Sequence, residues 1–330
     1  MKTRSFIPVS LTLLSVVLAF HPRTVSAQGN LTPPGAPGPA MRSLDQVEPR
    51  TPISSLPYMI TNAGSYYVTT NLSGGAGGGL AGAGIIVSAG DVSIDLNGFT
   101  LSGAGVGGGL EFGVLMMAIT TNLSIYNGTF RHWADGGVDT SSCRSARLER
   151  LRANDNGGIG GIRCGAGGVV KECAAMGNSG PGISSVNNAA IIDCIAFQNA
   201  TNGIAAGSGC RITGCSANIN GGAGILAGDF ATIKDCNAYQ NIGDGFAVGS
   251  SCLVTGNHST ANANTGIRAA GGSQIDGNFV QVNIFGLNAG NCLVVRNSIS
   301  GNVTNYVGTY VNRGPIDANA ATSTNAWANF

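Results

Sequence analysis

The second half of the chain repeats itself every 21 residues, and this period constrains the fold more than any other feature. A Gly followed by Ile, Phe or Leu recurs at steps of 21, 21, 21, 21, 21 and 20 residues, at Gly161, Gly182, Gly203, Gly224, Gly245, Gly266 and Gly286. Twelve residues after each Gly, with one slip at the end, stand Cys173, Cys194, Cys215, Cys236, Asn257, Asn278 and Asn297. Five residues further on, six consecutive repeats carry Asn178, Asn199, Asn220, Asn241, Asn262 and Asn283. Three columns that share one period indicate a solenoid.

The period also fits one kind of coil. Each repeat supplies three inward positions, namely the Ile after Gly, a Val or Ile in the middle of the repeat, and the Cys or Asn column. One coil cannot bury its inner face alone, but coils stacked about 4.8 Å apart form a continuous core. Parallel connections are nearly always right-handed. We therefore predict an all-β, single-stranded right-handed parallel β-helix with three-strand coils and end caps. A leucine-rich repeat is excluded because its L-x-x-L-x-L signature is absent.

The Asn column is expected to serve the turns. Asn tolerates the left-handed backbone that a sharp turn requires, and stacked amides can hydrogen-bond along the axis. Followed backwards, the inward column gives Leu151, Asn127 and Asn97 at steps of 22, 24 and 30 residues, so the early coils carry insertions. We place the β-helix at residues 58–306. Residues 307–330 lose the repeat and are expected to cap the end, with Trp327 and Phe330 as plugs.

The N-terminus has the features of an export signal. Lys2 and Arg4 precede an apolar run at residues 6–20, and small residues at Val25 and Ala27 favour cleavage before Gln28. We assign residues 1–27 to a signal peptide and residues 28–57 to a Pro/Gly-rich linker and lead-in segment. No later stretch is long and apolar enough to span a membrane. The mature chain is thus expected to be secreted, periplasmic or at the cell surface.

Low charge narrows the range of partners. Charged residues make up 10% of the chain against about 25% in ordinary domains, and the net charge is +1. Binding of nucleic acid through a strong positive field is therefore not expected. The sequence does not fix the oligomeric state, and a monomer is favoured.

The nine cysteines are expected to be mostly reduced, although an exported chain with many cysteines usually forms disulfides. Cys173, Cys194, Cys215 and Cys236 occupy equivalent inward positions, where stacking holds Cβ atoms near 4.8 Å apart, longer than the roughly 3.8 Å of a disulfide. Asn replaces Cys at this position in later coils. A core ladder of thiols is favoured over a disulfide ladder or a metal site.

Two segments of the early coils resemble a known family. Residues 92–101 (VSIDLNGFTL) and 122–129 (NLSIYNGT) are similar to secreted bacterial right-handed β-helix repeat proteins of the pectate-lyase-like superfamily, and the similarity runs from about Thr51 to the C-terminus. The resemblance implies the fold. The superfamily contains polysaccharide lyases, glycoside hydrolases, epimerases and non-catalytic members, so the resemblance leaves the activity open. No catalytic motif of the superfamily can be matched here residue by residue.

Charge is concentrated in the lengthened coils. Residues 128–155 hold nine charged side chains in 28 positions, whereas residues 156–306 hold twelve in 151. Asp139 and Arg163 each follow a Gly-Val or Gly-Ile pair, so they should point outward from adjacent coils. They are our candidate catalytic residues together with Asp135, because a carboxylate beside a guanidinium can orient an acidic sugar or move a proton. The alternative is an ion pair of little consequence.

Further polar residues of this region are candidate substrate-binding residues: Arg131, His132, Trp133, Arg144 and Asp155. An exposed Trp133 could stack on a sugar ring, or Trp133 could fill space beneath an insertion. Leu148, Leu151 and Ala153 fit the inward columns, which leaves the charged residues between them as a solvated strip on the outside: Arg147, Glu149, Arg150 and Arg152.

Two functions remain open from the sequence. The first is binding or processing of an extracellular polysaccharide, by lyase, hydrolase or epimerase chemistry if the protein is an enzyme. The second is a non-catalytic structural or surface-interaction solenoid. No cofactor is predicted, and Ca²⁺ enters only for a lyase. An ice-binding role is weaker because no regular outward Thr array occurs.

Overall fold

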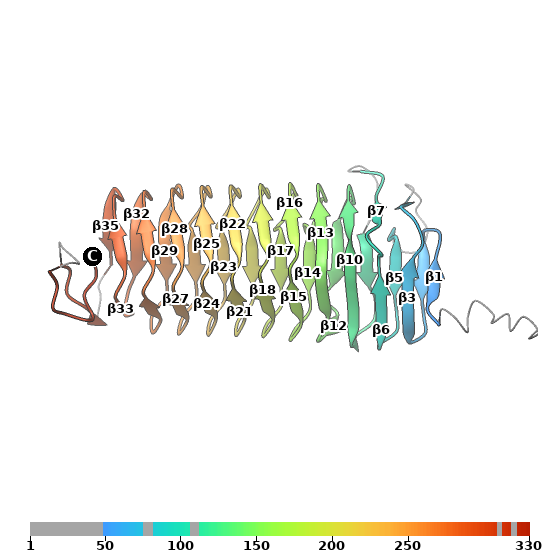
Figure 1. Ribbon diagram of the computed structural model, residues 1–330, viewed down its shortest axis with the longest axis horizontal. Helices are drawn as coiled ribbons and strands as arrows, with labels where there is room; N and C mark the ends of the chain where they lie inside the picture. Colours follow the sequence, from blue (N-terminus) through green and yellow to red (C-terminus); the bar gives the residue numbers. More distant parts are fainter. Residues whose placement is uncertain (1–48, 75–81, 106–111, 309–311, 318–321) are drawn as a thin grey trace, which may run out of the picture. The chain divides into compact units, whose positions relative to one another are not determined.

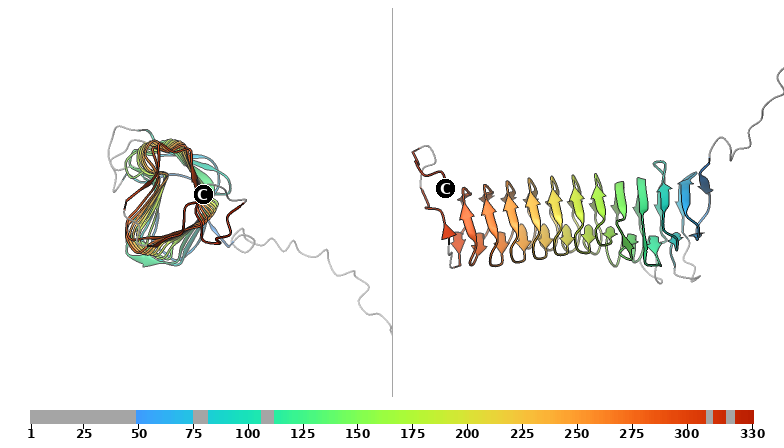
Figure 2. Two further views of the ribbon diagram at one scale, coloured as in Figure 1. Left: turned by 90° about the vertical axis from the view of Figure 1, so that its left-hand side faces the viewer. Right: turned by 90° about the horizontal axis from the view of Figure 1, so that it is seen from below.

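Short strands stack into a parallel β-helix whose coils follow one another along a single axis (Figures 1 and 2). The computed structural model describes residues 49–74, 82–105, 112–308, 312–317 and 322–330. The predicted signal peptide and most of the predicted linker lie outside these residues. Within the described part, all regular structure is strand, and no helix is long and apolar enough to cross a bilayer.

Each regular coil contributes one strand to each of three faces. Face 1 is a sheet of twelve parallel strands in the described residues: β2 (Tyr58–Ile60), β5 (Ile85–Val87), β8 (Phe112–Met116), β11 (Gly136–Thr140), β14 (Ile162–Cys164), β17 (Ile183–Ser185), β20 (Ile204–Ala206), β23 (Ile225–Ala227), β26 (Phe246–Val248), β29 (Thr265–Ala269), β32 (Phe285–Ala289) and β35 (Thr304–Val307).

Face 2 follows face 1 in every coil. It consists of β1 (Thr51–Ile53), β3 (Gly64–Val68), β6 (Val92–Asp95), the first parts of β10 (Leu123–Arg131) and β13 (Arg147–Asn154), β15 (Val169–Lys171), β18 (Ala190–Ile192), β21 (Arg211–Thr213), β24 (Thr232–Lys234), β27 (Leu253–Thr255), β30 (Gln274–Asp276), β33 (Leu293–Val295) and β36 (Asn312–Arg313).

Face 3 completes the coil. It consists of β4 (Leu72–Ser73), β7 (Thr100–Ser102), the second parts of β10 and β13, β16 (Ala174–Met176), β19 (Ile195–Phe197), β22 (Ser216–Asn218), β25 (Asn237–Tyr239), β28 (His258–Thr260), β31 (Phe279–Gln281) and β34 (Ser298–Ser300). A separate two-stranded pairing joins β9 (Thr120–Thr121) to β12 (Cys143–Arg144).

Apolar side chains fill the interior in columns that follow the register. Face 1 buries Ile162, Ile183, Ile204 and Ile225 on successive coils, face 2 buries Val170, Ile191, Ile212 and Ile233, and face 3 buries Ala175, Ala196, Ala217 and Ala238. A fully buried Ile contributes about 1.5–3 kcal/mol relative to an exposed one. Alternation of inward and outward residues along each strand thus produces the repeat that the sequence shows.

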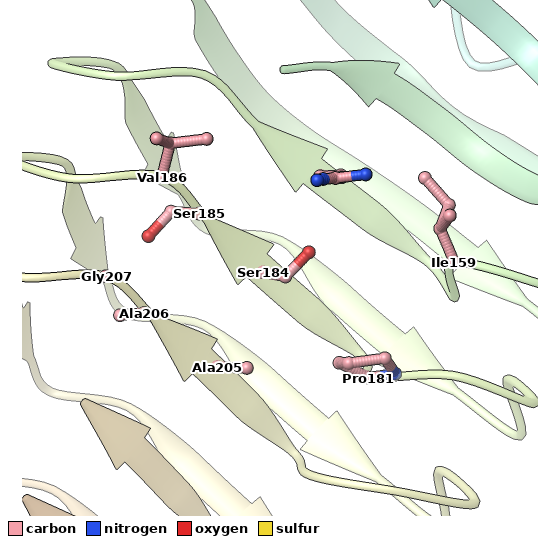
Figure 3. Close-up of a pocket in the computed structure, with 9 residues that line it drawn as sticks. Ile159, Pro181, Ser184, Ser185, Val186, Ala205, Ala206 and Gly207 are labelled. Carbon is pink, nitrogen blue, oxygen red and sulfur yellow. The ribbon is translucent and has the colours of Figure 1, made fainter. Parts of the chain in front are cut away.

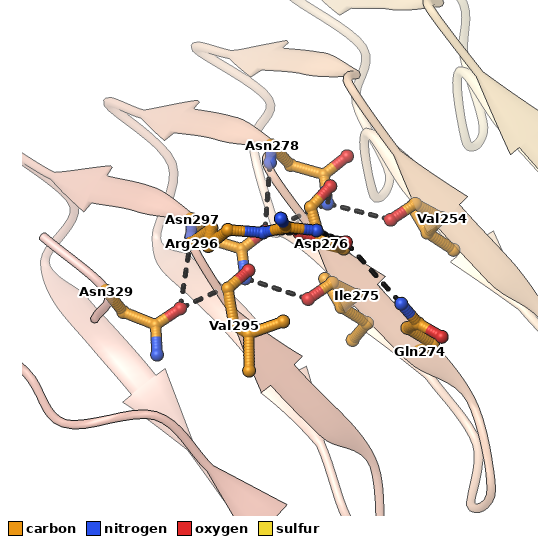
Figure 4. Close-up of polar contacts among 9 residues, drawn as sticks. All are labelled: Val254, Gln274, Ile275, Asp276, Asn278, Val295, Arg296, Asn297 and Asn329. Carbon is orange, nitrogen blue, oxygen red and sulfur yellow. Dashed lines mark hydrogen bonds and ion pairs between the residues drawn. The ribbon is translucent and has the colours of Figure 1, made fainter. Parts of the chain in front are cut away.

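Two buried ladders of side-chain amides run along the axis. The first joins Asn156 to Asn302: each Oδ1 accepts from the Nδ2 and backbone N of the previous Asn, at 2.8–3.1 Å. The second ladder begins at Asn257 and continues through Asn278 and Asn297 (Figure 4). Because each amide between the ends of a ladder has partners on both neighbouring coils, the coils are held in register.

The ladder explains the Gly of each repeat. A Cβ added at Gly203 would lie 2.6 Å from Asn220 Nδ2 and 2.7 Å from Gly224 O, closer than atoms pack. The same conflict recurs at Gly182 and Gly224. Gly is therefore required where the backbone passes beside the amide.

The left-handed corners lie one residue away from the predicted position. The buried Asn residues are not among the residues with positive φ. Each follows such a residue, for example Gln198 (φ 53°), Ile219 (φ 56°) and Gln240 (φ 54°). These corner side chains are exposed, so many residue types are accepted there. The amide role predicted for Asn holds, and the turn role belongs to the residue before it.

The inward column of the first coils also differs from the prediction. Leu151 pairs with Gly128 rather than Asn127, and the side chain of Leu96 fills the space that Gly128 leaves. Asn97 and Asn127 are instead left-handed corner residues, with φ of 50° and 61°. The error arises because insertions remove the fixed spacing on which the column was traced.

All nine cysteines are free and buried, as expected for a thiol ladder. Cys173, Cys194, Cys215 and Cys236 each direct Sγ toward a backbone carbonyl two residues earlier, at 3.2–3.4 Å. Burial raises the pKa of Cys164 to about 12, and a hydrogen bond that Cys194 accepts from the Cys215 thiol raises the pKa of Cys215 to about 12. These two thiols therefore stay protonated at neutral pH.

The C-terminal tail extends the second ladder. Asn329 Oδ1 accepts from Asn297 N and Nδ2 at 3.0 and 3.1 Å, and Asn329 Nδ2 donates to Val294 O at 3.1 Å (Figure 4). Asn329 is fully buried, whereas Trp327 is 57% exposed and lies against the Arg296 guanidinium. The predicted role of Trp327 as a plug is therefore wrong. The end of the second ladder is covered by Asn329 and not by an apolar side chain.

Candidate functional site

Asp139 and Arg163 lie side by side on face 1. The parallel register pairs them directly, Asp139 in β11 and Arg163 in β14. Asp139 Oδ1 accepts a hydrogen bond from Ser141 N at 2.8 Å, and its Oδ2 lies 3.9 Å from Arg163 Nη1. The Asp139 side chain is 12% exposed and that of Arg163 is 43% exposed. The predicted adjacency is present, and the loose pairing leaves guanidinium donors for another partner. A catalytic role stays a prediction.

A shallow depression of about 400 Å³ adjoins Arg163 (Figure 3). Ser184 and Ala205 lie at its base, at the outward positions of the next two coils, and Ile159 and Pro181 flank it. The depression exists because Ser and Ala are short, whereas the following coil has Leu226 at the same position. We call Asp139, Arg163, Ser184 and the depression the face-1 site.

Asp135 does not join this pair. It precedes β11, and its backbone O accepts a hydrogen bond from Ile159 N at 2.6 Å. Its Oδ2 is buried without a hydrogen-bond partner, and Asp135 does not line the depression. A buried acceptor without a hydrogen-bond partner lowers the free energy of unfolding by about 1–3 kcal/mol. The structure therefore brings one carboxylate, Asp139, to the face-1 site.

Three predicted binding residues form a second group, where face 3 turns toward face 1. His132 Nε2 lies 3.9 Å from Asp155 Oδ2, and both side chains are about half exposed. Both residues occupy left-handed corners of adjacent coils. Arg131, at the end of β10, donates from Nε to Ser102 Oγ at 3.1 Å. This group stands at the edge of the coil rather than on face 1.

Trp133 is buried, which contradicts its predicted contact with a sugar ring. It is 2% exposed, and its Nε1 donates to Leu101 O at 3.0 Å. A Cβ at Gly74 or at Gly84 would lie 2.7 Å from its ring. These glycines make room for the indole, so the alternative function, filling space within the early coils, is the one observed.

Arg144 lies apart from both groups. It belongs to β12, where it pairs with Thr121 of β9, and its side chain is exposed. Here the clustering of charges along the sequence does not correspond to a cluster in space.

A second acid–base pair on face 1 was missed. Arg268 occupies the same outward column as Arg163, and its Nε lies 2.6 Å from Asp244 Oδ2. Asp244 Oδ1 also accepts from Asn264 Nδ2 at 2.7 Å and from Thr265 N at 3.1 Å. Arg268 follows Gly266 and Ile267 just as Arg163 follows Gly161 and Ile162, so one more step along the column would have revealed it.

No group of three or more His, Cys, Asp or Glu residues suited to a metal ion occurs in the ranges that the structure describes.

Comparison with known proteins identifies the fold. No family model matches the chain, and no curated protein is significantly similar in sequence. The A-module of the mannuronan C-5 epimerase AlgE6 from Azotobacter vinelandii is 15% identical, with a TM-score of 0.59 over 77% of this chain and 91% of that chain. A double mutant of the periplasmic alginate epimerase AlgG is 13% identical, with a TM-score of 0.60 over 77% of this chain and 75% of that chain.

A third solved structure is the catalytic unit of a thermostable α-1,3-glucanase from Streptomyces thermodiastaticus. It is 15% identical, with a TM-score of 0.50 over 81% of this chain and 60% of that chain. At these identities the likeness establishes the architecture, and the predicted right-handed parallel β-helix is confirmed. Function has to be argued from the residues of this chain.

Proposed function

We propose that this protein is exported and binds an extracellular polysaccharide at the face-1 site. The observation that carries the proposal is the loose Asp139–Arg163 pair at the edge of a depression with hydroxyl groups from Ser184 and Ser185. A half-exposed guanidinium offers several donors in a fixed plane, and hydroxyls both donate and accept. The structures similar in fold act, by their names, on mannuronan, alginate and α-1,3-glucan, which supports a polysaccharide as the ligand class.

The composition of the site favours binding over hydrolysis. A glycosidase needs two carboxyl groups on one groove, about 5–9.5 Å apart. None of the residues that line this depression is acidic, and the Asp139 carboxylate lies beside it, against Arg163. If the protein is an enzyme, the pair suits proton abstraction next to a sugar carboxylate, with Arg163 neutralising the carboxylate and Asp139 accepting the proton. Epimerases and lyases share this first step. A requirement for Ca²⁺ belongs to the lyase version alone.

Affinity for neutral and uronate-containing polysaccharides tests the proposal. Arg163→Ala removes the donors of the face-1 site and should weaken binding about tenfold or more. The matched control is Arg268→Ala, which changes the same outward column five coils away, where Asp244 engages the guanidinium closely. Equal affinities for wild type and Arg163→Ala would place the ligand elsewhere.

Products are assayed in the same samples, as unsaturated sugars and as new reducing ends. Activity that survives Asp139→Ala combined with Arg163→Ala would remove both residues from the chemistry.

The alternative function is a non-catalytic structural solenoid. Ser184, Ala205, Leu226 and Ala247 leave a long part of face 1 without charge, which favours a scaffold. Failure of every glycan in the panel to bind would support this alternative.

A further inference from the structure

The corner between face 2 and face 3 carries a run of polar side chains that the face-1 site does not use. One left-handed residue forms this corner in each of four successive coils: Asn127 (φ 61°), Arg150 (φ 49°), Glu172 (φ 54°) and Asp193 (φ 52°). Arg150, Glu172 and Asp193 are exposed. This corner belongs to faces 2 and 3 of the coil, whereas the face-1 site lies on face 1. Of these four residues, only Arg150 belongs to the solvated strip expected from the sequence.

A depression of about 620 Å³ lies over this corner, and we call it the corner depression. Its sides carry Asn127, Arg150, Arg152, Glu172 and Asp193. Its base is open at Gly98, where an added Cβ would meet nothing within 4 Å.

A second hollow of about 260 Å³ on face 2 shares Arg150 with the corner depression. It adds the hydroxyl groups of Ser93, Ser124 and Tyr126. Arg150 therefore stands between two adjoining hollows, both lined by hydroxyl, amide and charged groups.

A polar network spanning three coils orients Arg150. Its Nε donates to Asn127 Oδ1 at 2.7 Å, and Asn127 Nδ2 donates to Asp95 Oδ1 at 3.3 Å. Asp95 Oδ2 in turn lies 3.3 Å from Arg50 Nη1. On the other side, Glu149 lies 3.8 Å from Arg150 and 2.6 Å from Arg147. A guanidinium held in this way loses little freedom when it binds a ligand.

Arg152 differs from Arg150 because its charge is uncompensated. It is exposed on face 3, and within the described residues it makes no hydrogen bond or ion pair. Two coils further along the corner depression stands Asp193, and between them Glu172 is paired with Lys171 at 3.0 Å. The Lys171 ammonium lowers the pKa of the Glu172 carboxyl, so Glu172 is an ionised acceptor at neutral pH. The depression thus has a cationic end with donors and an anionic end with acceptors.

We propose that the corner depression is a second saccharide site, specific for a carboxylated sugar chain. Arg152 and Arg150 bind a sugar carboxylate, and Glu172 and Asp193 accept hydrogen bonds from the hydroxyls of neighbouring units. Guanidinium groups match carboxylates in a planar, two-bond geometry, and this geometry distinguishes an acidic from a neutral sugar. The inference rests on the proposed polysaccharide function and adds a separate site and a ligand class to it.

Calorimetric titration with a hexauronide, a linear oligomer of six uronic acid units, tests the inference on the full chain. Wild type should bind at two sites. Arg152→Ala should remove one of the two sites or weaken its affinity about tenfold or more. Arg152→Lys should give an intermediate loss of affinity, because lysine keeps the positive charge but lacks the planar two-bond geometry of the guanidinium. The control is Arg211→Ala on β21 of the regular coils, an exposed arginine that makes no ion pair or side-chain hydrogen bond within the part of the chain that the structure describes. This change should leave both sites unchanged.

Each outcome separates the two sites. Loss of one site in Arg152→Ala and of the other in Arg163→Ala supports both proposals. Loss in Arg152→Ala alone supports the corner site and contradicts the face-1 site, and loss in Arg163→Ala alone does the reverse. Two outcomes overturn the corner site as proposed: no binding of the hexauronide by wild type, or equal, Arg152-dependent binding of a neutral hexaglucan. Unchanged melting temperatures confirm that the variants are folded.

Discussion

The early coils and the regular coils share one architecture but differ in how they use the outside of it. In the early coils, β10 and β13 run for nine and eight residues across a corner, and they carry five of the nine charged residues of positions 128–155: Arg131, Arg147, Glu149, Arg150 and Arg152. In the regular coils, most strands are three residues long and the outward residues of face 1 are small. Stable stacking in the regular coils comes from the buried Asn and Cys columns. Recognition, in this account, lies where the early coils, in which the repeat is broken, meet the first regular coils.

The difference extends to the interior. The early coils contain Trp133, whereas the regular coils contain mainly Ile, Val, Ala, Cys and Asn in repeated positions, with Phe246 as their largest fully buried side chain. A large side chain needs space from several coils at once, which Gly74, Gly84 and Gly113 provide. A repeat with identical coils has no such space, because each position recurs every 4.8 Å or so. Irregular spacing therefore permits both the large core residue and the outward charges.

The largest expected effect separates the two tryptophans. Trp133→Ala should lower the free energy of unfolding by about 3–5 kcal/mol, because it opens a cavity within the early coils. Trp327→Ala should change it by less than about 1 kcal/mol, since that side chain is 57% exposed. Urea denaturation followed by circular dichroism measures both. Similar losses in the two variants would contradict the placement of Trp133 in the core.

A smaller effect is expected from the ladder of the regular coils. Asn220→Ala removes four side-chain hydrogen bonds, to Asn199 N and Nδ2, Asn241 Oδ1 and Ala196 O. Because these partner groups stay buried without hydrogen bonds, the free energy of unfolding should fall by about 2–4 kcal/mol. The control is Asn187→Ala, at an exposed site where the side chain accepts one bond from Ser208 N. If the control costs as much, the ladder does not hold the coils in register.

The smallest effect concerns pH and the buried thiols. The pKa of Cys164 is raised by burial from 9.0 to about 12. Below pH 9 the thiol is protonated in both states, so its contribution is complete. Above pH 9 the unfolded chain loses its proton first, and stability falls by up to about 1.4 kcal/mol per pH unit until the folded thiol ionises as well. Cys164→Ala should therefore show a shallower loss of stability between pH 9 and 10.5. Parallel profiles for the variant and wild type would show that Cys164 is not buried as described.

The sequence was informative where the period is constant. Three equally spaced columns predicted the faces, the inward Ile residues and the stacked amides, because in-register stacking repeats the same environment in every coil. It was less informative about the corners: Gln198 and Ile219 adopt left-handed backbone, but nothing in their residue types announces it. Spacing places a column, while the conformation between columns is set by closure of the coil.

The candidate site shows the same limit. Asp139 and Arg163 could be paired from the sequence because both follow a Gly and an inward apolar residue. Trp133 and Arg144 could not be placed, since the first depends on glycines in other coils and the second on the β9–β12 pairing. Arg152 and Asp193 are 41 positions apart in sequence and border one depression, a relation that only the stacked coils make visible.

Hydrogen–deuterium exchange with and without bound polysaccharide tests most directly whether recognition is confined to the early coils and the first regular coils next to them. The ligand is the polysaccharide that binds wild type most tightly in the affinity panel. The account predicts slower exchange in peptides from residues 92–193, on face 1 around Arg163 and at the corner around Arg152. Peptides from residues 211–300 should exchange at the same rate in both samples. Protection restricted to residues 211–300 would contradict the account.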